Sequence, residues 1–458
     1  MAPLARGGDN PCGTQFGCAP FETTLAIKQP AYDNAHARPE SQMAGGAGTS
    51  PRSRVAAFAN LVVDRIVTAL KKAGDDRFGS GCGHAAPRTI AVIAGNALSL
   101  VHFRGPLLKS LVQAGHRVIA IAPPAPEWDG RVTALGAEHE PVVFARASID
   151  PIGDMRARRT LEAVFRRESV DVVLASTIKP VVYGMPAAMR AGASSRVALI
   201  TGLGYAFGSE RLSQRVLGVG ARLLYKRALR FATAVRFQNR DDRDVFLRSR
   251  LVDPAKVAVV NGSGVDTQHY PYTAPPERRH VRFLLIARLL VDKGIREYVE
   301  AARLVQSRRD DCEFHLVGPS DANPMAIDQA TLAQWRRDGV VTLHDAAEDV
   351  RPHLASCDVY VLPSYREGTP RTVLEAMATG RPVITTDAPG CRETTVHGDN
   401  GFLVPVRDPV ALADAMHRLA ADRSLRREMG RRSRVMAEER YDVHKVNADM
   451  MRAMGLVE

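Results

Sequence analysis

The sequence has no apolar run long enough to cross a membrane. Its longest stretch without a charged residue, Thr89 to Phe103, falls short of the roughly 18 to 20 residues that a membrane span needs. No signal-peptide pattern follows Met1. Hydrophobic residues make up 45% of the chain and charged residues 24%, a composition typical of soluble globular proteins. These features predict a protein of the cytoplasm.

Cysteine is scarce, and so are clusters of aspartate. The six cysteines are scattered, and no two of them form a C-x-x-C pair. This spacing argues against a disulfide framework and against a cysteine metal site, and it fits a reducing compartment. The adjacent pair Asp241-Asp242 is typical of a helix start rather than of a metal site. We therefore expect no metal and no other cofactor.

Aromatic residues are also few, at 6% of the chain, whereas basic residues are in excess. Residues 89–275 hold 25 Lys and Arg against 15 Asp and Glu, a net charge of +10, while residues 276–458 hold 27 against 28. A basic first half is suited to an anionic membrane surface, a diphosphate-bearing substrate or nucleic acid. We expect no nucleic acid, because single-strand binding needs aromatic side chains interleaved with the basic ones.

Composition and strand–helix alternation divide the chain into four segments. Residues 1–88 are rich in Gly, Pro, Ala and Ser, which predicts disorder, with the pattern of one amphipathic helix at Val55 to Lys72. This segment is open to three interpretations: a dispensable extension, a start codon assigned too early, or a functional arm. Apolar strands alternate with helices from Thr89 onward, which predicts two α/β domains with parallel sheets, 89–270 and 280–440. Residues 441–458 are predicted to form a final helix.

One stretch, Val359 to Pro389, concentrates the features of a ligand site. It is predicted to form a buried strand, a charged turn with Glu367, a helix with Glu375, and a second strand. Thr369 and Pro370 are predicted as the N-cap and the first residue of that helix. Helix N-termini at the carboxyl ends of parallel strands bind phosphate. Carboxylates beside such a site are suited to the hydroxyl groups of a phosphorylated sugar.

The string PSYREGTPRTVLEAMATGRPVI, in which Glu367 and Glu375 are separated by seven residues, resembles the retaining family-4 glycosyltransferases. The resemblance covers about Thr89 to Arg440. It implies the GT-B fold, in which two Rossmann-like doubly wound domains face each other across a cleft, and a last helix that crosses back to the first domain. It also implies transfer of a sugar from a nucleotide-sugar donor.

The same resemblance assigns roles to residues of the second domain. Arg288 and Lys293, in the string ARLLVDKG, match the phosphate site of the family. Two cations at a strand end and a helix start are also chemically suited to clamp a diphosphate. Glu367 would lie at the donor sugar and Glu375 would accept hydrogen bonds from the ribose. The backbone of the turn and of the first strand end would complete the donor site, through Gly368, Thr369, Arg371, Gly95 and Asn96.

Three strings in the first domain, STIKPVVYGMPAA, ITGLGYAF and VRFQNRDDRDVF, resemble one branch of the family. That branch adds hexoses or N-acetylhexosamines to undecaprenyl-diphosphate-linked sugars in polysaccharide or glycan assembly. The resemblance implies a lipid-diphosphate sugar acceptor, and we expect a UDP-linked sugar as the donor. The basic first domain and such an acceptor together predict a peripheral location on the inner face of the plasma membrane. Many family members carry a histidine after the fourth strand, whereas this chain has Ser176 to Lys179. Lys179, Gly202 and Gly204 are candidates for contacts with the sugar or the acceptor.

The sequence is compatible with two other functions. A sugar-nucleotide epimerase shares the fold but lacks the paired-glutamate string. A basic binding protein without catalysis would use segments such as Leu212 to Phe231, where arginines and lysines alternate with leucines. Such a segment either lies on a membrane surface or packs on the domain with a solvated basic face.

Overall fold

The computed structural model describes residues 86–144, 151–203, 212–321, 323 and 325–457, without the side chains of 151–152 and 212–217. The chain divides into two units, Met1–Gly83 and His84–Glu458, and all described residues belong to the second. The predictions for residues 1–85, including the amphipathic helix, lie outside the described residues.

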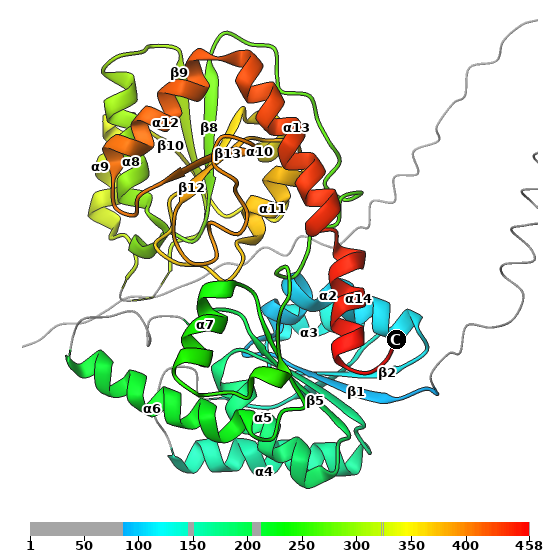
Figure 1. Cartoon of the computed structure of the whole chain (residues 1–458). Coiled ribbons are helices and arrows are strands. Elements are labelled where there is room, and N and C mark those ends of the chain that lie inside the picture. Colours follow the sequence, from blue (N-terminus) through cyan, green and yellow to red (C-terminus); the bar gives the residue numbers. More distant parts are fainter. Residues whose placement is uncertain (1–85, 145–150, 204–211, 322, 324, 458) are drawn as a thin grey trace, which may run out of the picture. The chain divides into compact units, whose positions relative to one another are not determined.

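The first sheet is parallel throughout, with the strand order β3-β2-β1-β4-β5-β6-β7 (Figure 1). Its strands are β1 (Thr89–Ile93), β2 (Arg117–Ala122), β3 (Glu138–Pro141), β4 (Val172–Ser176), β5 (Ser195–Ile200), β6 (Ala234–Phe237) and β7 (Val257–Val259). Its helices are α2 (Ala97–Gln113), α3 (Pro126–Thr133), α4 (Pro151–Arg167), α5 (Ile178–Ala191), α6 (Leu212–Leu229) and α7 (Arg240–Arg248). Helices α4, α5 and α6 pack side by side on one face, and α2 and α3 on the other.

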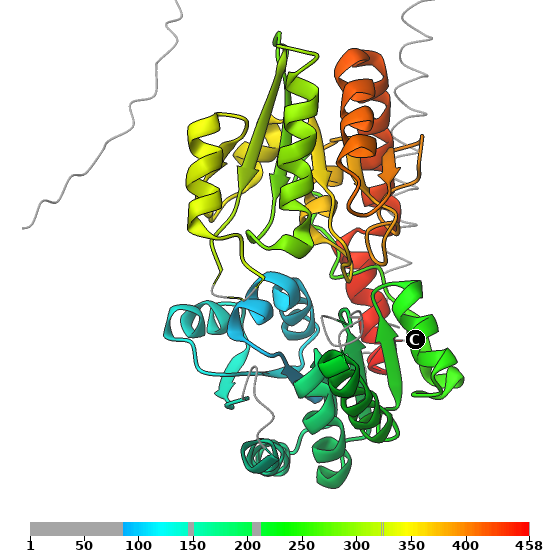
Figure 2. The same cartoon turned by 90° about the vertical axis from the view of Figure 1, so that its left-hand side faces the viewer.

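The second sheet is also parallel, with the order β10-β9-β8-β11-β12-β13, and helices flank both of its faces (Figure 2). Its strands are β8 (Val281–Ile286), β9 (Cys312–Val317), β10 (Thr342–His344), β11 (Val359–Leu362), β12 (Val383–Thr386) and β13 (Gly401–Val404). Its helices are α8 (Ile295–Gln306), α9 (Gln329–Asp338), α10 (Arg351–Ser356), α11 (Arg371–Ala378), α12 (Pro409–Ala421) and α13 (Arg423–Arg440). The order reverses beside β1 in the first sheet and beside β8 in the second, and ligands bind at such points in open parallel sheets.

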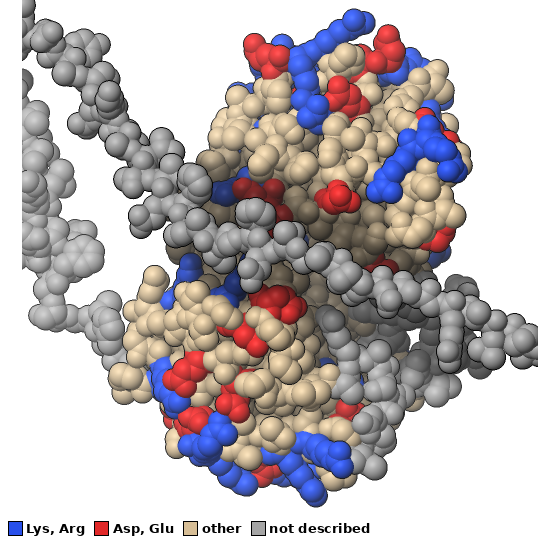
Figure 3. Space-filling view, turned by 180° about the vertical axis from the view of Figure 1, so that it is seen from behind, with Lys and Arg blue, Asp and Glu red and all other residues tan. Residues whose placement is uncertain are grey.

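The surface mixes charges of both signs. On the face shown in Figure 3, Lys and Arg lie among Asp and Glu on both domains. Arg117, for example, contacts Glu138 and Glu168 at 2.7 Å each. Exposed pairs of this kind contribute little to stability, on the order of 0 to 1 kcal/mol.

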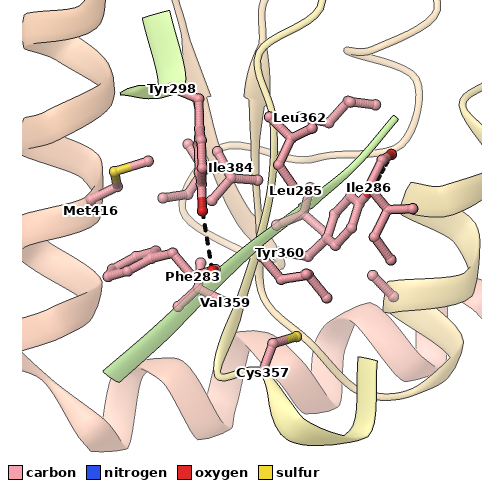
Figure 4. Packing of buried hydrophobic residues seen from close by; sticks show 14 of the residues in the cluster. Phe283, Leu285, Ile286, Tyr298, Cys357, Val359, Tyr360, Leu362, Ile384 and Met416 are labelled. Atoms are coloured by element: carbon pink, nitrogen blue, oxygen red, sulfur yellow. Dashed lines mark hydrogen bonds between the residues drawn. The ribbon is translucent and has the colours of Figure 1, made fainter. Parts of the chain in front are cut away.

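The core of the second domain is built on strands that are buried on both faces, such as β11. Figure 4 shows how two tyrosines enter this core without leaving a hydroxyl unpaired. Tyr298 donates to the carbonyl of Phe283, and Tyr360 donates to the carbonyl of Ile286, each at 3.1 Å. Both bonds tie neighbouring elements to β8, so the carboxyl end of that strand, where Arg288 follows, is held firmly.

The last helix, α14 (Val443–Ala453), packs on the first domain. Its residues Val446 and Met450 are buried in the same apolar cluster as Leu108 of α2. Asn447 also donates from Nδ2 to Oγ of Ser110 at 3.1 Å. The chain therefore returns to the first domain after completing the second.

Candidate active site

A cavity of about 360 Å³ is lined by residues that follow strands of both sheets. The lining from the first domain is Ser99, Phe103, Arg104, Ser176, Thr177, Thr201, Gln238 and Ser263. The lining from the second domain is Ile286, Ala287, Arg288, Lys293, Leu362, Glu367, Gly368, Thr369, Pro370, Arg371 and Thr372. Six residues that the sequence predicts for the site, Arg288, Lys293, Glu367, Gly368, Thr369 and Arg371, thus meet in one place.

Lys293 and Glu367 form the most buried charged pair of the cavity. Lys293 Nζ lies 2.5 Å from Glu367 Oε1, and the two side chains are 17% and 15% exposed. Burial works to lower the pKa of Lys293, but the charge of Glu367 and its hydrogen bond outweigh burial and raise that pKa. The ammonium therefore stays charged, as a site for a diphosphate requires.

Arg288 lies at the more open side of the cavity. Its guanidinium contacts Asp321 at 2.8 Å, and its side chain is 57% exposed. An exposed pair is weak. A phosphate in the cavity would therefore compete with Asp321 for this arginine at little cost.

The turn Glu367–Thr369 fits closely against the first domain. Asn239 Nδ2 donates to the carbonyl of Gly368 at 3.1 Å, and Thr369 Oγ1 donates to the carbonyl of Gln238 at 2.9 Å. A Cβ atom at position 368 would lie 2.0 Å from the carbonyl oxygen of Thr201, so only glycine fits there. The prediction of Thr369 as N-cap is wrong: Pro370 is the N-cap of α11, because the Thr369 hydroxyl is used by the contact with Gln238.

A second contact fixes the same turn. The guanidinium of Arg366 pairs with the buried carboxylate of Asp242 on α7. Asp242 also donates its backbone N–H to the side chain of Asn239, the N-cap of α7, at 2.8 Å. Burial raises the pKa of Asp242, although the charge of Arg366 opposes the shift. The helix start predicted at Asp241-Asp242 is confirmed.

Glu375 does not line the cavity. It is 5% exposed, and its Oε1 lies 2.8 Å from Nε of Arg371, one turn earlier on α11. Burial raises the pKa of Glu375, although Arg371 and a hydrogen bond from Tyr270 work in the opposite direction. A ribose hydroxyl would reach this carboxylate only after Arg371 moved aside, so the ribose contact stays a prediction.

Gly95, Asn96, Lys179 and Gly202, which the sequence also predicts for the site, are not part of the cavity lining. Asn96 caps α2 by accepting from the N–H of Ser99 at 2.7 Å, and a Cβ at Gly95 would meet Thr177 at 3.2 Å. Gly202 has φ 141° and faces Gly368, which its missing side chain allows. Lys179 pairs with Asp154 at 3.3 Å. Gly204 lies outside the described residues.

None of the lining residues from the first domain was predicted from the sequence as a site residue, and two of them, Thr177 and Arg104, are unusual. Thr177 has φ 72° and ψ 168°, a conformation that is strained for a β-branched residue, and no sequence pattern signals it. Arg104 is 4% exposed in the middle of α2. Its spacing signals it, because it follows Leu100 by four residues and precedes Leu107 and Leu108 on the buried helix face.

No group of His, Cys, Asp and Glu in the described ranges is arranged to hold a metal ion. Within the same part of the chain, no helix has both the length and the apolar character required to cross a bilayer.

Comparisons with known proteins give a consistent result for both domains. Residues 280–422 match the family described as Glycosyl transferases group 1, and residues 104–262 match the family described as Glycosyl transferase 4-like domain.

Two curated relatives resemble much of the chain. N,N'-diacetylbacillosaminyl-diphospho-undecaprenol alpha-1,3-N-acetylgalactosaminyltransferase of Campylobacter jejuni is 28% identical, over 72% of this chain and 88% of the relative. UDP-Gal:alpha-D-GlcNAc-diphosphoundecaprenol alpha-1,3-galactosyltransferase of Escherichia coli is 26% identical, over 61% of this chain and 73% of the relative.

Solved structures agree on the architecture. A glycosyltransferase from Rickettsia africae superposes with a TM-score of 0.67 at 17% identity, over 81% of this chain and 99% of the other. HepE from Anabaena in complex with UDP gives 0.67 at 18% identity, over 80% and 99%. These likenesses, with the two parallel sheets, confirm the predicted GT-B fold.

Proposed function

We propose a reaction for this chain, which belongs to the glycosyltransferases of the GT-B fold: it transfers a hexose or N-acetylhexosamine from a UDP-sugar to a sugar carried on a lipid diphosphate. The observation that carries the proposal is the cavity in which Arg288, Lys293 and Glu367 meet polar residues of the first domain. The alternative of a binding protein without catalysis does not explain why a half-buried charged pair, Lys293 and Glu367, is kept in the lining of that cavity.

The cationic residues are suited to the departure of a nucleoside diphosphate. Charge develops on the diphosphate as its bond to the sugar breaks, and cations already in place stabilise that charge. Lys293 is fixed by Glu367, so it needs little rearrangement. Glu367 can at the same time accept hydrogen bonds from hydroxyls of the donor sugar, since a carboxylate has several acceptor positions.

The composition of the lining favours retention and independence from metal. Glu367 is the single carboxylate among the described lining residues, and no histidine accompanies it. Its pairing with Lys293 makes it a poor general base, whereas an inverting transfer requires one. A leaving phosphate oxygen that takes the acceptor proton would allow retention. The lining also holds four basic side chains and one carboxylate, whereas a magnesium ion is bound by carboxylates and other oxygen ligands.

The acceptor is proposed from the relatives. Both the Campylobacter and the Escherichia coli proteins are named for transfer onto sugars linked to diphospho-undecaprenol. An acceptor of this kind is anchored in a membrane, so we place the enzyme on the inner face of the plasma membrane, in polysaccharide or glycan assembly.

The direct test incubates the protein with a panel of UDP- and GDP-sugars and short-chain lipid-diphosphate sugars, followed by mass spectrometry. We expect a product heavier by one hexose or N-acetylhexosamine, an unchanged anomeric configuration by NMR, and full activity with EDTA. Conversion of the nucleotide sugar without any transfer would support an epimerase instead. Transfer that requires a divalent metal would contradict the metal-free mechanism.

Arg288→Ala and Glu375→Ala test the donor site. Both variants should bind UDP more weakly by calorimetry, because each removes a proposed contact to the nucleotide. Arg288→Ala should also raise the barrier of turnover by roughly 2–4 kcal/mol, the usual scale for losing one charge stabiliser. Arg303→Ala is the matched control, since Arg303 pairs with Glu300 and Asp338 on the exposed side of α8 and is not part of the cavity. Wild-type UDP affinity in both test variants would contradict the assignment.

A further inference from the structure

Arg104 is a buried cation without a partner. It lies on the buried face of α2 with Leu100, Leu107 and Leu108 and is 4% exposed. Within the described ranges of the chain, its guanidinium makes no hydrogen bond and no ion pair, and it lines the cavity.

The other basic residues of the same lining are all paired. Arg288 contacts Asp321, Lys293 contacts Glu367, and Arg371 contacts Glu375. Only the first of these pairs is well exposed. Arg104 is therefore the basic side chain of the described lining whose charge no carboxylate balances.

The surroundings of Arg104 oppose its charge. Burial, together with the nearby charge of Arg371, lowers the pKa of its guanidinium to about 10. The group stays protonated at neutral pH even so. A buried cation that lacks a partner is unfavourable in a folded protein, whereas an apolar side chain on the same helix face would be favourable. No contact within the described residues accounts for an arginine here, and its place in the cavity lining points to a ligand.

We propose that Arg104 binds a diphosphate in this cavity. The inference rests on the proposed function, because donor and acceptor there each carry a diphosphate. A guanidinium gives two parallel hydrogen bonds to phosphate oxygens and remains charged when dry, so it suits this group better than lysine does. Binding would supply the missing negative charge and relieve the repulsion from Arg371.

The acceptor is the favoured source of that diphosphate. Arg288 and Lys293 of the second domain already face the donor diphosphate in the proposed reaction. Arg104 comes from the first domain, which also contributes serines and threonines to the same lining. It is thus placed to fix the diphosphate of a lipid-linked sugar while the donor is bound.

Calorimetry on the full chain separates the two sources. One titration uses UDP alone, and a second uses inorganic pyrophosphate with UDP saturating. The variants are Arg104→Gln and Arg104→Lys, with Lys109→Gln as the control, because Lys109 lies exposed on the same helix and does not line this cavity. For an acceptor site, Arg104→Gln should weaken pyrophosphate binding about tenfold or more and leave UDP affinity unchanged, as expected for loss of a charged hydrogen bond.

For a donor site, UDP affinity itself should fall by that factor. Unchanged affinity for both probes in Arg104→Gln overturns the proposal, and so does an equal loss in Lys109→Gln. A wild-type protein that binds pyrophosphate through Arg104 but does not bind UDP would contradict the proposed function and leave the Arg104 site standing.

A stability measurement excludes a merely structural role. Arg104→Met should unfold at the same temperature as the wild type or higher, because it replaces an unpaired buried charge by an apolar side chain. The KM for a lipid-diphosphate sugar should rise about tenfold in Arg104→Gln, whereas the KM for an alkyl glycoside of the same sugar should not change. A clear loss of stability in Arg104→Met, with both KM values unchanged in Arg104→Gln, would show that the arginine serves the fold.

Discussion

The carboxyl group of Glu375 is buried, and burial disfavours its ionised form. Burial raises its pKa above the ordinary value of 4.5, even with Arg371 beside it. Below pH 4.5 the carboxyl is protonated in both the folded and the unfolded chain. As the pH rises from 4.5 to the raised pKa, ionisation favours the unfolded chain, so the wild type loses stability, and the loss is constant above that range.

Glu375→Gln should therefore unfold at a higher temperature than the wild type at pH 7.5, and the difference should vanish near pH 4. Glutamine keeps an acceptor for Arg371 and removes the charge. The measurement is thermal unfolding across pH for both proteins. A variant that is less stable at pH 7.5 would show that the pair with Arg371 outweighs burial.

Thr177 stores backbone strain in the cavity lining. Its φ of 72° and ψ of 168° lie in a region populated almost only by glycine, and such a residue costs roughly 1–3 kcal/mol. Thr177→Gly should raise the free energy of unfolding by about 1 kcal/mol, after the entropy of glycine is subtracted. It should lower activity, because the cavity loses a hydroxyl. Thr133→Gly, at the end of helix α3, should instead lower the free energy of unfolding by roughly 0.3–0.5 kcal/mol, the difference in helix propensity between threonine and glycine. Equal effects of the two substitutions would argue against strain.

The sequence predicted those site residues whose charged side chains directly follow a strand of the sheet. Arg288, Lys293 and Glu367 follow strands of one parallel sheet, and the carboxyl ends of such strands meet at one edge. Arg104 was not predicted as a site residue. The helix pattern shows that this arginine faces inward, but it does not show whether a carboxylate lies within reach of the guanidinium in the folded protein. The position of Glu375 behind Arg371 depends on side-chain packing that spacing does not contain.

Among the elements, the buried strands with a continuous apolar sequence were predicted well. Strands with a polar or glycine-containing sequence were not. Strand β11 reads as a continuous apolar run and is buried throughout. Strand β3 (Glu138–Pro141) is polar and lies at the sheet edge, so its place was not evident from hydrophobicity. Strand β13 begins at Gly401, at the end of a glycine-rich turn. Only glycine fits at this position, because a Cβ would lie 1.8 Å from the carbonyl oxygen of Val383.

Helix α14 depends on tertiary packing, since it is short and contacts α2 of the first domain. Met450→Ala should lower the free energy of unfolding by about 2–4 kcal/mol, because Met450 is 1% exposed and its loss leaves a cavity. Met189→Ala is the control: Met189 is 50% exposed, and its effect should stay within about 0.5 kcal/mol. Urea unfolding measures both. Similar small effects would mean that α14 is not packed on α2 in solution.

For the whole molecule, the question is where on the surface the excess basic residues of 89–275 gather. The face in Figure 3 mixes both signs, so it offers no broad positive surface. Helix α6 differs, because it buries Ala221, Tyr225 and Leu229 on one side. The opposite side carries exposed apolar and basic residues at spacings of three and four: Val219, Arg222, Leu223, Lys226, Arg227 and Arg230.

Such a face suits the surface of an anionic membrane, where the apolar side chains enter the headgroup layer and the basic ones meet phosphate. Leu223 is 67% exposed and Val219 56%, which a helix serving only the domain core does not require. Each basic residue near an anionic surface contributes about 1 kcal/mol, and the attraction fades within a Debye length. Four of them give attachment that is useful but reversible, as an enzyme with a membrane-anchored acceptor needs.

Vesicle sedimentation tests this attachment. The wild type should bind vesicles that contain anionic lipid, more weakly as salt increases, and should not bind neutral vesicles. Changing Arg222, Lys226 and Arg227 of α6, together with Arg230 directly after it, to glutamine should abolish most of this binding. The control changes four exposed arginines of α13 to glutamine, Arg423, Arg427, Arg431 and Arg432, so that the net charge falls equally. If both variants lose binding to the same extent, net charge and not α6 directs the protein to the membrane, and binding to neutral vesicles would contradict the electrostatic mechanism itself.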